Sequence, residues 1–404
     1  MQDMSTGSSG PAFETLLSRD EIAAANELTR RWLDSRTEIP GAASALGIWP
    51  LLTALASGAS GETRNELLAA AGIAPSREVE LAEALLNAVA HAPGIRLAIG
   101  AWARAAITLD PEWIEKQPVD SIGSLTGDRG IDGPMLDAWA SHHTDGLIER
   151  MPIELDSDIV LILASALLVR TTWATEFTEG ATHFKTGPWA GERRYAGLSN
   201  TIEGDVLRVS EYGSVLTVPG SDDIDVLLAL GHAEFAPRDV MSVLIDAATD
   251  PTWGRSASER QAAKRAPGVR IETYPSATPQ EGPEVRVETV RFDVSAELDL
   301  SEDAAALGLV TAMDDDRAQF DRLAADDVFV SRAKQACTAT FGPKGFESAA
   351  VTAMTIDWMG APQMNHHRVR AVVTFDRPFA FLARHRPSGL ILVAGWVDEP
   401  EVVG

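Results

Sequence analysis

The sequence predicts an α+β fold. Amphipathic helical patterns fill most of the first hundred residues, whereas from about residue 159 the chain consists mainly of short apolar, β-branched segments separated by turn residues. Helices gathered in one part of a chain and strands in another argue against alternating β-α units. The chain shows no internal repeat, so a solenoid or propeller is not expected.

The N-terminal region predicts a short tail and two helices. Residues 1–14 are small and polar, which is typical of a disordered tail. Ser18 and Glu21 have the spacing of a capping box, and the apolar face that follows predicts a helix ending near residue 34. Residues 42–56 are rich in Ala and Leu and contain Pro50, so we expect a buried helix with a kink.

Three further helices are expected from local signals. Thr63 with Glu66 predicts a helix start, and Gly72 stands where a left-handed C-terminal cap is wanted. Ser76 is expected to open a helix that runs to about residue 91. Pro134 is expected to start a helix that breaks near residue 144.

Strand patterns follow these helices. They cover residues 95–107, 159–169, 206–209, 214–218 and 224–230. The run 159–169 is continuously apolar, which suits a strand covered on both faces. Val285 and Val287 have the opposite parity to the alternating run from Val290 onward, which a bulge or a strand break near Thr289 would reconcile. Residues 250–284 are polar and rich in Pro and Gly, and we interpret them as a surface excursion within one domain.

Charge and composition exclude several functions. With 34 Lys and Arg against 59 Asp and Glu, the net charge of −25 argues against a nucleic-acid binder, which needs a positive field. The longest apolar run is about half the length needed to span a bilayer. The single Cys337 excludes a disulfide framework and a cysteine-based zinc site. The N-terminus has no signal-peptide pattern, so we expect a cytoplasmic protein, unless it is exported by an unrecognised route.

No common catalytic motif is present, so we expect neither an enzyme nor a bound cofactor. There is no nucleophile elbow, no phosphate-binding loop, no dinucleotide fingerprint and no paired-histidine zinc motif. The histidine pairs 142–143 and 366–367 are adjacent in sequence and point to different faces, so we interpret them as solvated. The acidic run 314–316 lacks the alternating ligands of a calcium loop. Metal sites are therefore not expected.

The C-terminal third resembles the serpins, the serine protease inhibitor family. The segment FDRPFAF, Phe375 to Phe381, followed by RHRPSGLILVAGWVDEP, is similar to that family's C-terminal signature. The resemblance extends to GIWPLLTALASGASGETRNELLAAAGI (47–73), WASHHTDGLIERM (139–151) and SALLVRTTWATEF (165–177). It also covers residues 290–320 and so runs from about residue 20 to residue 400.

The resemblance implies one domain over residues 15–404, with three β-sheets, about nine helices and an exposed reactive-centre loop at about residues 343–374. Its implied function is that of a suicide substrate. A serine protease attacks the loop and forms an acyl-enzyme, and the cut loop inserts as a new strand into the main sheet. The protein would act as a monomer on a serine protease, without nucleic acid or membrane.

The expected hinge of this loop departs from the family pattern. It comprises Pro343, Gly345, Phe346, Glu347, Ser348, Ala349, Ala350 and Val351. Small uncharged residues such as Ser348 and Ala350 suit a strand that enters a crowded sheet. Phe346 and Pro343 stand where a small residue and Glu are usual. Burying a Phe gains about 1.5–3 kcal/mol, whereas overpacking costs about 1–3 kcal/mol, so these magnitudes leave open whether Phe346 slows insertion. A non-inhibitory serpin, cleaved as a substrate or acting as a binding or chaperone-like protein, is the alternative function.

Two positions are candidates for the reactive bond. Counting about fourteen residues beyond Gly345 gives Met359-Gly360, where a large apolar side chain would suit a chymotrypsin-, elastase- or subtilisin-like protease. Counting back about eight residues from Phe375 places it near His367-Arg368. Arg368 or Arg370 as the bait residue would suit a trypsin-like protease. We prefer the first, because the length of the inserted strand fixes the bait position.

The resemblance also implies a region where the main sheet opens. Its residues here are Ser44, Ser165, Trp173 and Gln335. Ser165 and Gln335 replace the Asn and His that the family usually carries, and Gly47 stands where a second Ser is common. We therefore expect sheet opening to use a different set of hydrogen bonds.

Overall fold

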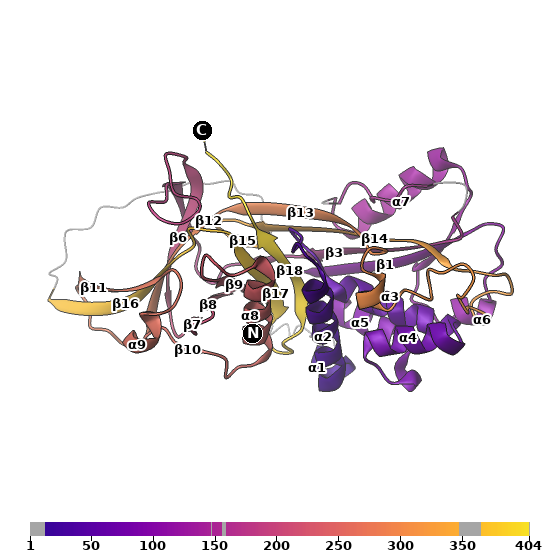
Figure 1. Cartoon of the computed structure of the whole chain (residues 1–404), viewed down its shortest axis with the longest axis horizontal. Coiled ribbons are helices and arrows are strands. Elements are labelled where there is room, and N and C mark those ends of the chain that lie inside the picture. The colour runs from indigo at the N-terminus through magenta and orange to yellow at the C-terminus, as the bar shows by residue number, and fades with distance from the viewer. Residues whose placement is uncertain (1–12, 147, 156–158, 347–364, 404) are drawn as a thin grey trace, which may run out of the picture.

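A computed structural model describes residues 13–146, 148–155, 159–346 and 365–403. In this part of the chain ten α-helices surround three sheets of seven, six and five strands. Figure 1 shows the N-terminal helices at one end of an elongated molecule and the five-stranded sheet at the other. The predicted α+β fold with three sheets is confirmed, with ten helices where about nine were expected.

The helices are α1 (Phe13–Leu16), α2 (Arg19–Ser35), α3 (Ala45–Gly58), α4 (Gly61–Ala71), α5 (Leu81–His91), α6 (Pro111–Ile114), α7 (Arg129–His143), α8 (Pro237–Thr249), α9 (Arg260–Ala263) and α10 (Ala304–Leu307), with a 3₁₀ turn at Pro75–Arg77. The strands are β1 (Ile95–Arg104), β2 (Ile122–Leu125), β3 (Leu161–Val169), β4 (Thr171–Thr172), β5 (Thr178–Thr182), β6 (Tyr195–Glu203), β7 (Leu207–Val209), β8 (Ser214–Pro219), β9 (Ile224–Leu230), β10 (Arg255–Ser256), β11 (Val269–Ser276), β12 (Glu284–Val290), β13 (Phe292–Asp299), β14 (Val330–Phe341), β15 (Gly345–Phe346), β16 (His366–Thr374), β17 (Phe379–His385) and β18 (Ile391–Val397).

The predicted start of the second helix is confirmed in detail. Ser18 accepts a hydrogen bond from the Glu21 backbone, and the Glu21 carboxylate accepts one from the Ser18 backbone, so both halves of the capping box form. The chain is already ordered before this point, because α1 begins at Phe13, whose ring is buried against His385. The expected tail of residues 1–14 is therefore too long by at least two residues.

Lowering the pH is expected to destabilise the protein through His385. Burial lowers the pKa of this ring more strongly than the nearby Glu14 and Asp223 carboxylates raise it. The unfolded chain therefore binds the proton more tightly than the folded chain. The resulting stability is complete above the unfolded pKa of about 6.5 and is lost as the pH falls below it. We expect urea midpoints to fall less between pH 7.5 and pH 5.5 in His385→Gln than in the wild type. Equal losses would contradict this assignment.

Three helix-start predictions were wrong. In each case the helix begins at a residue other than the one that the local signal indicates. Helix α4 begins at Gly61, and Glu66 lies in its middle, where its carboxylate accepts backbone N–H bonds from Val310 and Thr311. Ser76 belongs to the 3₁₀ turn, and α5 starts only at Leu81. Pro134 lies inside α7, which starts five residues earlier with Asp128 as its cap. Gly72 does adopt the predicted left-handed cap, with φ of 66°.

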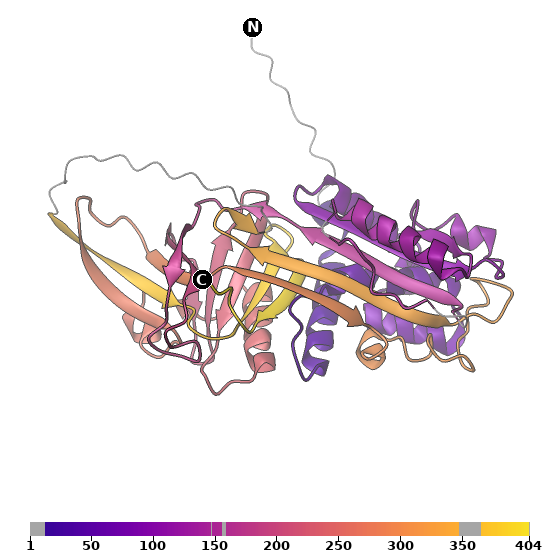
Figure 2. The ribbon, with the colours of Figure 1, turned by 90° about the horizontal axis from the view of Figure 1, so that it is seen from above.

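The seven-stranded sheet forms the centre of the molecule. Its long strands run in the order β2-β1-β3-β14-β13. All nine residues of β3 are buried, which confirms a strand covered on both faces. Helix α7 lies over β1 and β3 on one side, and α3 and α5 pack on the other side (Figures 1 and 2). Any strand that enters this sheet must therefore fit between two packed layers.

The expected strand break is confirmed near Thr289. Strand β12 ends at Val290 in the five-stranded sheet, and β13 begins at Phe292 in the seven-stranded sheet. The parity change therefore marks the point where the chain passes from one sheet to the other. No helix in the described part of the chain is both long and apolar enough to cross a membrane.

Candidate functional site: a strand-acceptor seam and its loop

Two parallel strands meet in the middle of the main sheet. β3 and β14 pair directly, from Leu161 beside Val330 to Leu167 beside Cys337, and we call this contact the seam. Their other neighbours, β1 and β13, are both antiparallel to them. Parallel ladders are slightly weaker per residue than antiparallel ones. A strand that entered the seam antiparallel to both sides would replace one parallel ladder with two antiparallel ladders.

The chain has already begun such a strand at one end of the seam. After β14 it turns back at residues 342–345, where the Gly342 N–H donates to the Gly345 carbonyl at 2.9 Å. Gly345 and Phe346 then form β15, which pairs antiparallel with Phe341 on one side and with Thr171 and Thr172 on the other. A Cβ on Gly345 would lie 2.3 Å from the Thr171 carbonyl oxygen, so this approach requires glycine.

Phe346 is fully buried in this arrangement. Its side chain is 1% exposed, its ring lies 6.2 Å from that of Phe381, and it stands opposite Phe341 in the strand register. The Phe341 ring in turn stacks on Phe292 at 5.3 Å. The site that holds the Phe346 side chain therefore exists before the loop is cleaved.

Trp173 stabilises the turn that precedes Phe346 through two hydrogen bonds. Its indole N–H donates to the Gly342 carbonyl at 2.8 Å and its backbone N–H to the Lys344 carbonyl at 2.9 Å. The ring lies 4.7 Å from Phe341. The backbone N–H of Phe177 donates to the Pro343 carbonyl at 2.7 Å, so Pro343 also belongs to this fastened turn.

Ser44, Ser165 and Gln335 come together at the middle of the seam. Gln335 and Ser165 are register partners, and the Gln335 amide nitrogen donates to Ser165 Oγ at 3.2 Å and to the Ser44 carbonyl at 2.8 Å. The Gln335 amide oxygen accepts the Ser44 N–H at 2.9 Å, and Ser44 Oγ donates to the Leu392 carbonyl. All three side chains are buried. The Gln335–Ser165 bond crosses the seam, the Gln335–Ser44 bonds join β14 to the start of α3, and Trp173 lies apart from them, at the turn.

Gly47 stands at a position where a side chain would crowd the Gln335–Ser165 pair. A Cβ at this position would lie 2.7 Å from Ser165 Oγ and 3.0 Å from the Gln335 amide nitrogen. The glycine therefore leaves the space that Gln335 fills.

Replacing Gln335 by Leu is expected to destabilise the closed sheet by about 1–3 kcal/mol. The change keeps the volume but leaves the buried Ser44 N–H without its partner, which typically costs about 1–3 kcal/mol. Urea unfolding measures the loss. Gln117→Leu is the control, because Gln117 bonds only to Ser57 and Trp113 near α6. Equal losses in both variants would contradict a special role for Gln335.

The far end of the expected loop is a strand. Residues 366–374 form β16, which pairs antiparallel with β11 and parallel with β12. Where β12 has not yet begun, the Gln280 amide replaces a strand by donating to the Val369 carbonyl at 2.7 Å and accepting its N–H at 2.9 Å. The loop therefore ends before residue 366, and the expected limit near residue 374 was too late.

This placement argues against the alternative reactive bond. Within β16, His367 pairs with Pro275 and Arg368 pairs with Tyr274. The Arg368 guanidinium binds the buried Glu284 carboxylate at 2.9 Å, and Glu284 also accepts the Tyr274 hydroxyl at 2.8 Å. A protease must bind the residues around the scissile bond as a free extended segment, which this paired strand does not offer. The remaining candidates, Met359-Gly360, and the hinge residues 347–351 lie outside the described residues.

Strand β11 lies in the segment for which the sequence predicts a surface excursion. In the structure, residues 269–276 form the outer neighbour of β16. The alternation of Val269, Ile271 and Thr273 with charged residues was the available signal. It was weak because these side chains are only half-buried or exposed.

Cys337 is buried in the core, on strand β14. Among the described residues no group of three His, Cys, Asp or Glu side chains could hold a metal. Burial raises the pKa of the Cys337 thiol to about 12, so it stays protonated and behaves as a core residue.

These features define a class: a three-sheet α+β protein that holds the first residues of a loop strand between two parallel strands of its main sheet. Comparison with known proteins agrees. A family model described as Serpin (serine protease inhibitor) matches residues 24–186 and 269–400. The chain belongs to the serpin family, whose members are in general inhibitors of serine proteases rather than catalysts.

Individual relatives cover most of the chain. Serpin-Z6C of Oryza sativa subsp. japonica is 26% identical over an alignment of 394 residues that covers 88% of this chain and 90% of that protein. Plasminogen activator inhibitor 1 of Sus scrofa is 22% identical and covers 66% of this chain and 61% of its own length. Among solved structures, the thermophilic serpin Tengpin in its native state has a TM-score of 0.72 at 16% identity, covering 95% of both chains. Thyroxine-binding globulin in complex with thyroxine has a TM-score of 0.66 at 17% identity, covering 95% of this chain and 99% of that one.

Proposed function

We propose that this serpin inhibits a serine protease as a suicide substrate, through cleavage and insertion of its reactive-centre loop into the seam. The observation that carries the proposal is β15. Its two residues already lie antiparallel between β14 and β4, in the place and direction that a longer inserted strand would take. Insertion therefore extends a strand that exists and needs no new nucleus.

The insertion step has an evident driving force. As the loop enters, each residue exchanges part of one parallel ladder for two antiparallel ones. In an inserted strand, the residues that would alternate onto the same face as Phe346 are Ser348, Ala350, Thr352 and Met354. Three of these four are small, so the core beneath β3 would need little rearrangement. Cleavage is the trigger, because an uncut loop is tied at its far end to β16, which is paired on both edges.

The proposed bait is Met359, preceded by Trp358. An apolar side chain of this size fits a chymotrypsin-, elastase- or subtilisin-like pocket. The protein should be incubated with one protease of each type and with trypsin, and the products separated on denaturing gels. We expect a covalent adduct with at least one apolar-specific protease and cleavage after Met359. Cleavage by all of these proteases without any adduct would contradict inhibition.

The second candidate is a non-inhibitory serpin that serves as a binding protein. It is motivated by Phe346 and Pro343, which stand where inhibitory serpins usually carry a small residue and Glu. Thyroxine-binding globulin, a structural neighbour, is a serpin seen bound to a small molecule. Under this hypothesis the loop is cut without adduct formation and the melting temperature does not rise after cleavage.

A further inference from the structure

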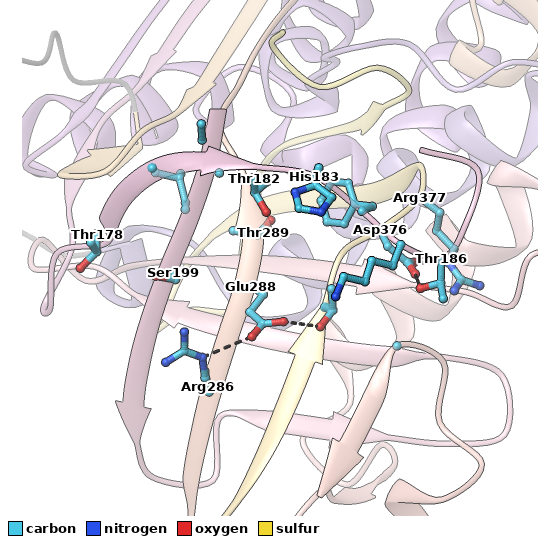
Figure 3. Close-up of a pocket in the computed structure, with 18 of the residues that line it drawn as sticks. Thr178, Thr182, His183, Thr186, Ser199, Arg286, Glu288, Thr289, Asp376 and Arg377 are labelled. Atoms are coloured by element: carbon cyan, nitrogen blue, oxygen red, sulfur yellow. Dashed lines mark hydrogen bonds and ion pairs between the residues drawn. The ribbon is translucent and has the colours of Figure 1, made fainter. Parts of the chain in front are cut away.

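The five-stranded sheet carries a hollow that the inhibitory mechanism does not use. It has a volume of about 770 Å³ and lies over β5, β6 and β12, beside the segments that follow β5 and β16 (Figure 3). None of its lining residues belongs to β3, β14 or β15. The hollow is therefore separate from the seam and from the hinge.

The floor of the hollow is made of small residues. Gly180 of β5 and Gly197 of β6 are register partners, and Thr178 and Ser199 form the next pair on the same face. A Cβ on Gly180 would meet no atom within 4 Å, so the space above it is open. A Cβ on Gly197 would lie 2.7 Å from Thr182, so glycine is required there. The floor offers hydroxyl groups and backbone without bulky side chains.

The carboxylates of the hollow have partners. Glu288 accepts hydrogen bonds from Arg270 at 3.1 Å, from Arg286 at 3.3 Å and from the Thr374 hydroxyl at 2.8 Å. Figure 3 shows Arg286 directed at Glu288 across this face of the sheet. Burial alone would raise the pKa of Glu288, but these bonds outweigh it and lower the pKa. The Glu288 carboxylate is therefore charged at neutral pH, and its oxygens already accept hydrogen bonds from the protein.

The other two carboxylates of the hollow also have partners. Asp376 accepts Arg377 Nε at 2.8 Å and the Thr186 hydroxyl at 2.9 Å, and Figure 3 shows this cluster at one end of the hollow. Glu179 lies 3.7 Å from the Arg291 guanidinium. A cation next to each acidic group weakens its repulsion of a negatively charged ligand.

The cationic groups, by contrast, keep unused donors. Lys185 makes no hydrogen bond or ion pair with another described residue, although it lines the hollow. Arg286 and Arg377 each use only Nε toward a described partner, of the five N–H donors that a guanidinium carries. The lining holds four cationic side chains against three carboxylates, in a protein with 34 against 59 overall. The hollow is thus locally positive on an acidic molecule.

We propose that this hollow binds a polyol that bears several phosphate or sulfate groups. Lys185, Arg286 and Arg377 would bind the oxyanions through charge-assisted hydrogen bonds. The hydroxyls of Thr178 and Ser199 would meet the polyol ring over the glycine floor. A single phosphate would fill only a small part of the volume. This inference does not depend on the proposed inhibitory function.

The test uses the full-length protein and isothermal titration calorimetry. The probes are inositol hexakisphosphate, sucrose octasulfate and neutral myo-inositol, at 0.15 M salt, where the Debye length of about 8 Å screens repulsion from the rest of the acidic surface. We expect one-to-one binding of at least one polyanion and none of myo-inositol. Preference for the phosphorylated or the sulfated probe identifies the source of the ligand.

Variants that each change one charge localise the site. Lys185→Glu and Arg286→Gln are each expected to weaken binding about tenfold, the loss of one charge-assisted contact. Lys116→Glu, an exposed lysine beyond α6, is the matched control and should leave the affinity unchanged. Melting curves without ligand establish that each variant is folded. Absence of binding, or equal weakening by Lys116→Glu, would overturn the proposal.

Discussion

Cutting the reactive-centre loop is expected to raise the melting temperature by about 10–20 °C. An inserted strand of about ten residues would exchange the seven register pairs between β3 and β14 for two antiparallel ladders. The net gain is roughly ten hydrogen bonds, or about 10 kcal/mol at about 1 kcal/mol each. In a chain of this length 1 kcal/mol shifts the melting temperature by about 1–2 °C.

Calorimetry of the intact and the cleaved protein measures this rise. The cut must be located by mass spectrometry, because only cleavage in the loop releases its near end for insertion. An unchanged or lower melting temperature after a cut at Met359-Gly360 would show that the loop does not insert.

Replacing Phe346 is expected to lower the yield of covalent adduct. The side chain is buried against Phe381, and truncating a buried Phe to Ala typically costs about 3–5 kcal/mol. β15 has only two residues, so this loss is enough to release the hinge from the sheet. Insertion must then begin without a preformed strand and becomes slower. Hydrolysis of the acyl-enzyme can then release the protease before insertion is complete.

Phe13→Ala is the matched control for this prediction. Phe13 is as deeply buried as Phe346 but lies in α1, on His385. Both variants should lose stability, and only Phe346→Ala should shift the products from adduct to cleaved serpin. If Phe346→Ala or Phe346→Thr instead increased the yield of adduct, the native site would be strained and Phe346 would slow insertion.

Much of the fold and part of the site could be predicted from the sequence. The resemblance to serpins implies that Ser44, Ser165, Trp173 and Gln335 share one region, and in the structure Ser44, Ser165 and Gln335 contact one another whereas Trp173 lies at the turn. The parity change near Thr289 correctly marked the passage between two sheets, because side-chain alternation reports directly on which face is buried.

Other features could not be predicted because they depend on long-range contacts. The turn at residues 342–345 and the burial of Phe346 require the Thr171 carbonyl and the Phe381 ring, which are distant in sequence. Glu66 had the spacing of a capping residue, but the backbone of Val310 and Thr311 competes for its carboxylate. Local patterns report local geometry, and they fail where a distant group offers a better partner.

A disulfide lock across the seam tests the central claim most directly. Ala166 of β3 and Ala336 of β14 are register partners, and a cysteine pair there, with Cys337→Ala to remove the native thiol, would hold the two strands together. The control pair joins Ala98 of β1 to Ala166, a contact that insertion does not open. We predict that the oxidised seam lock is cleaved without adduct, that reduction restores the adduct, and that the control pair forms adduct in both states. Adduct formation by the oxidised seam lock would contradict insertion between β3 and β14.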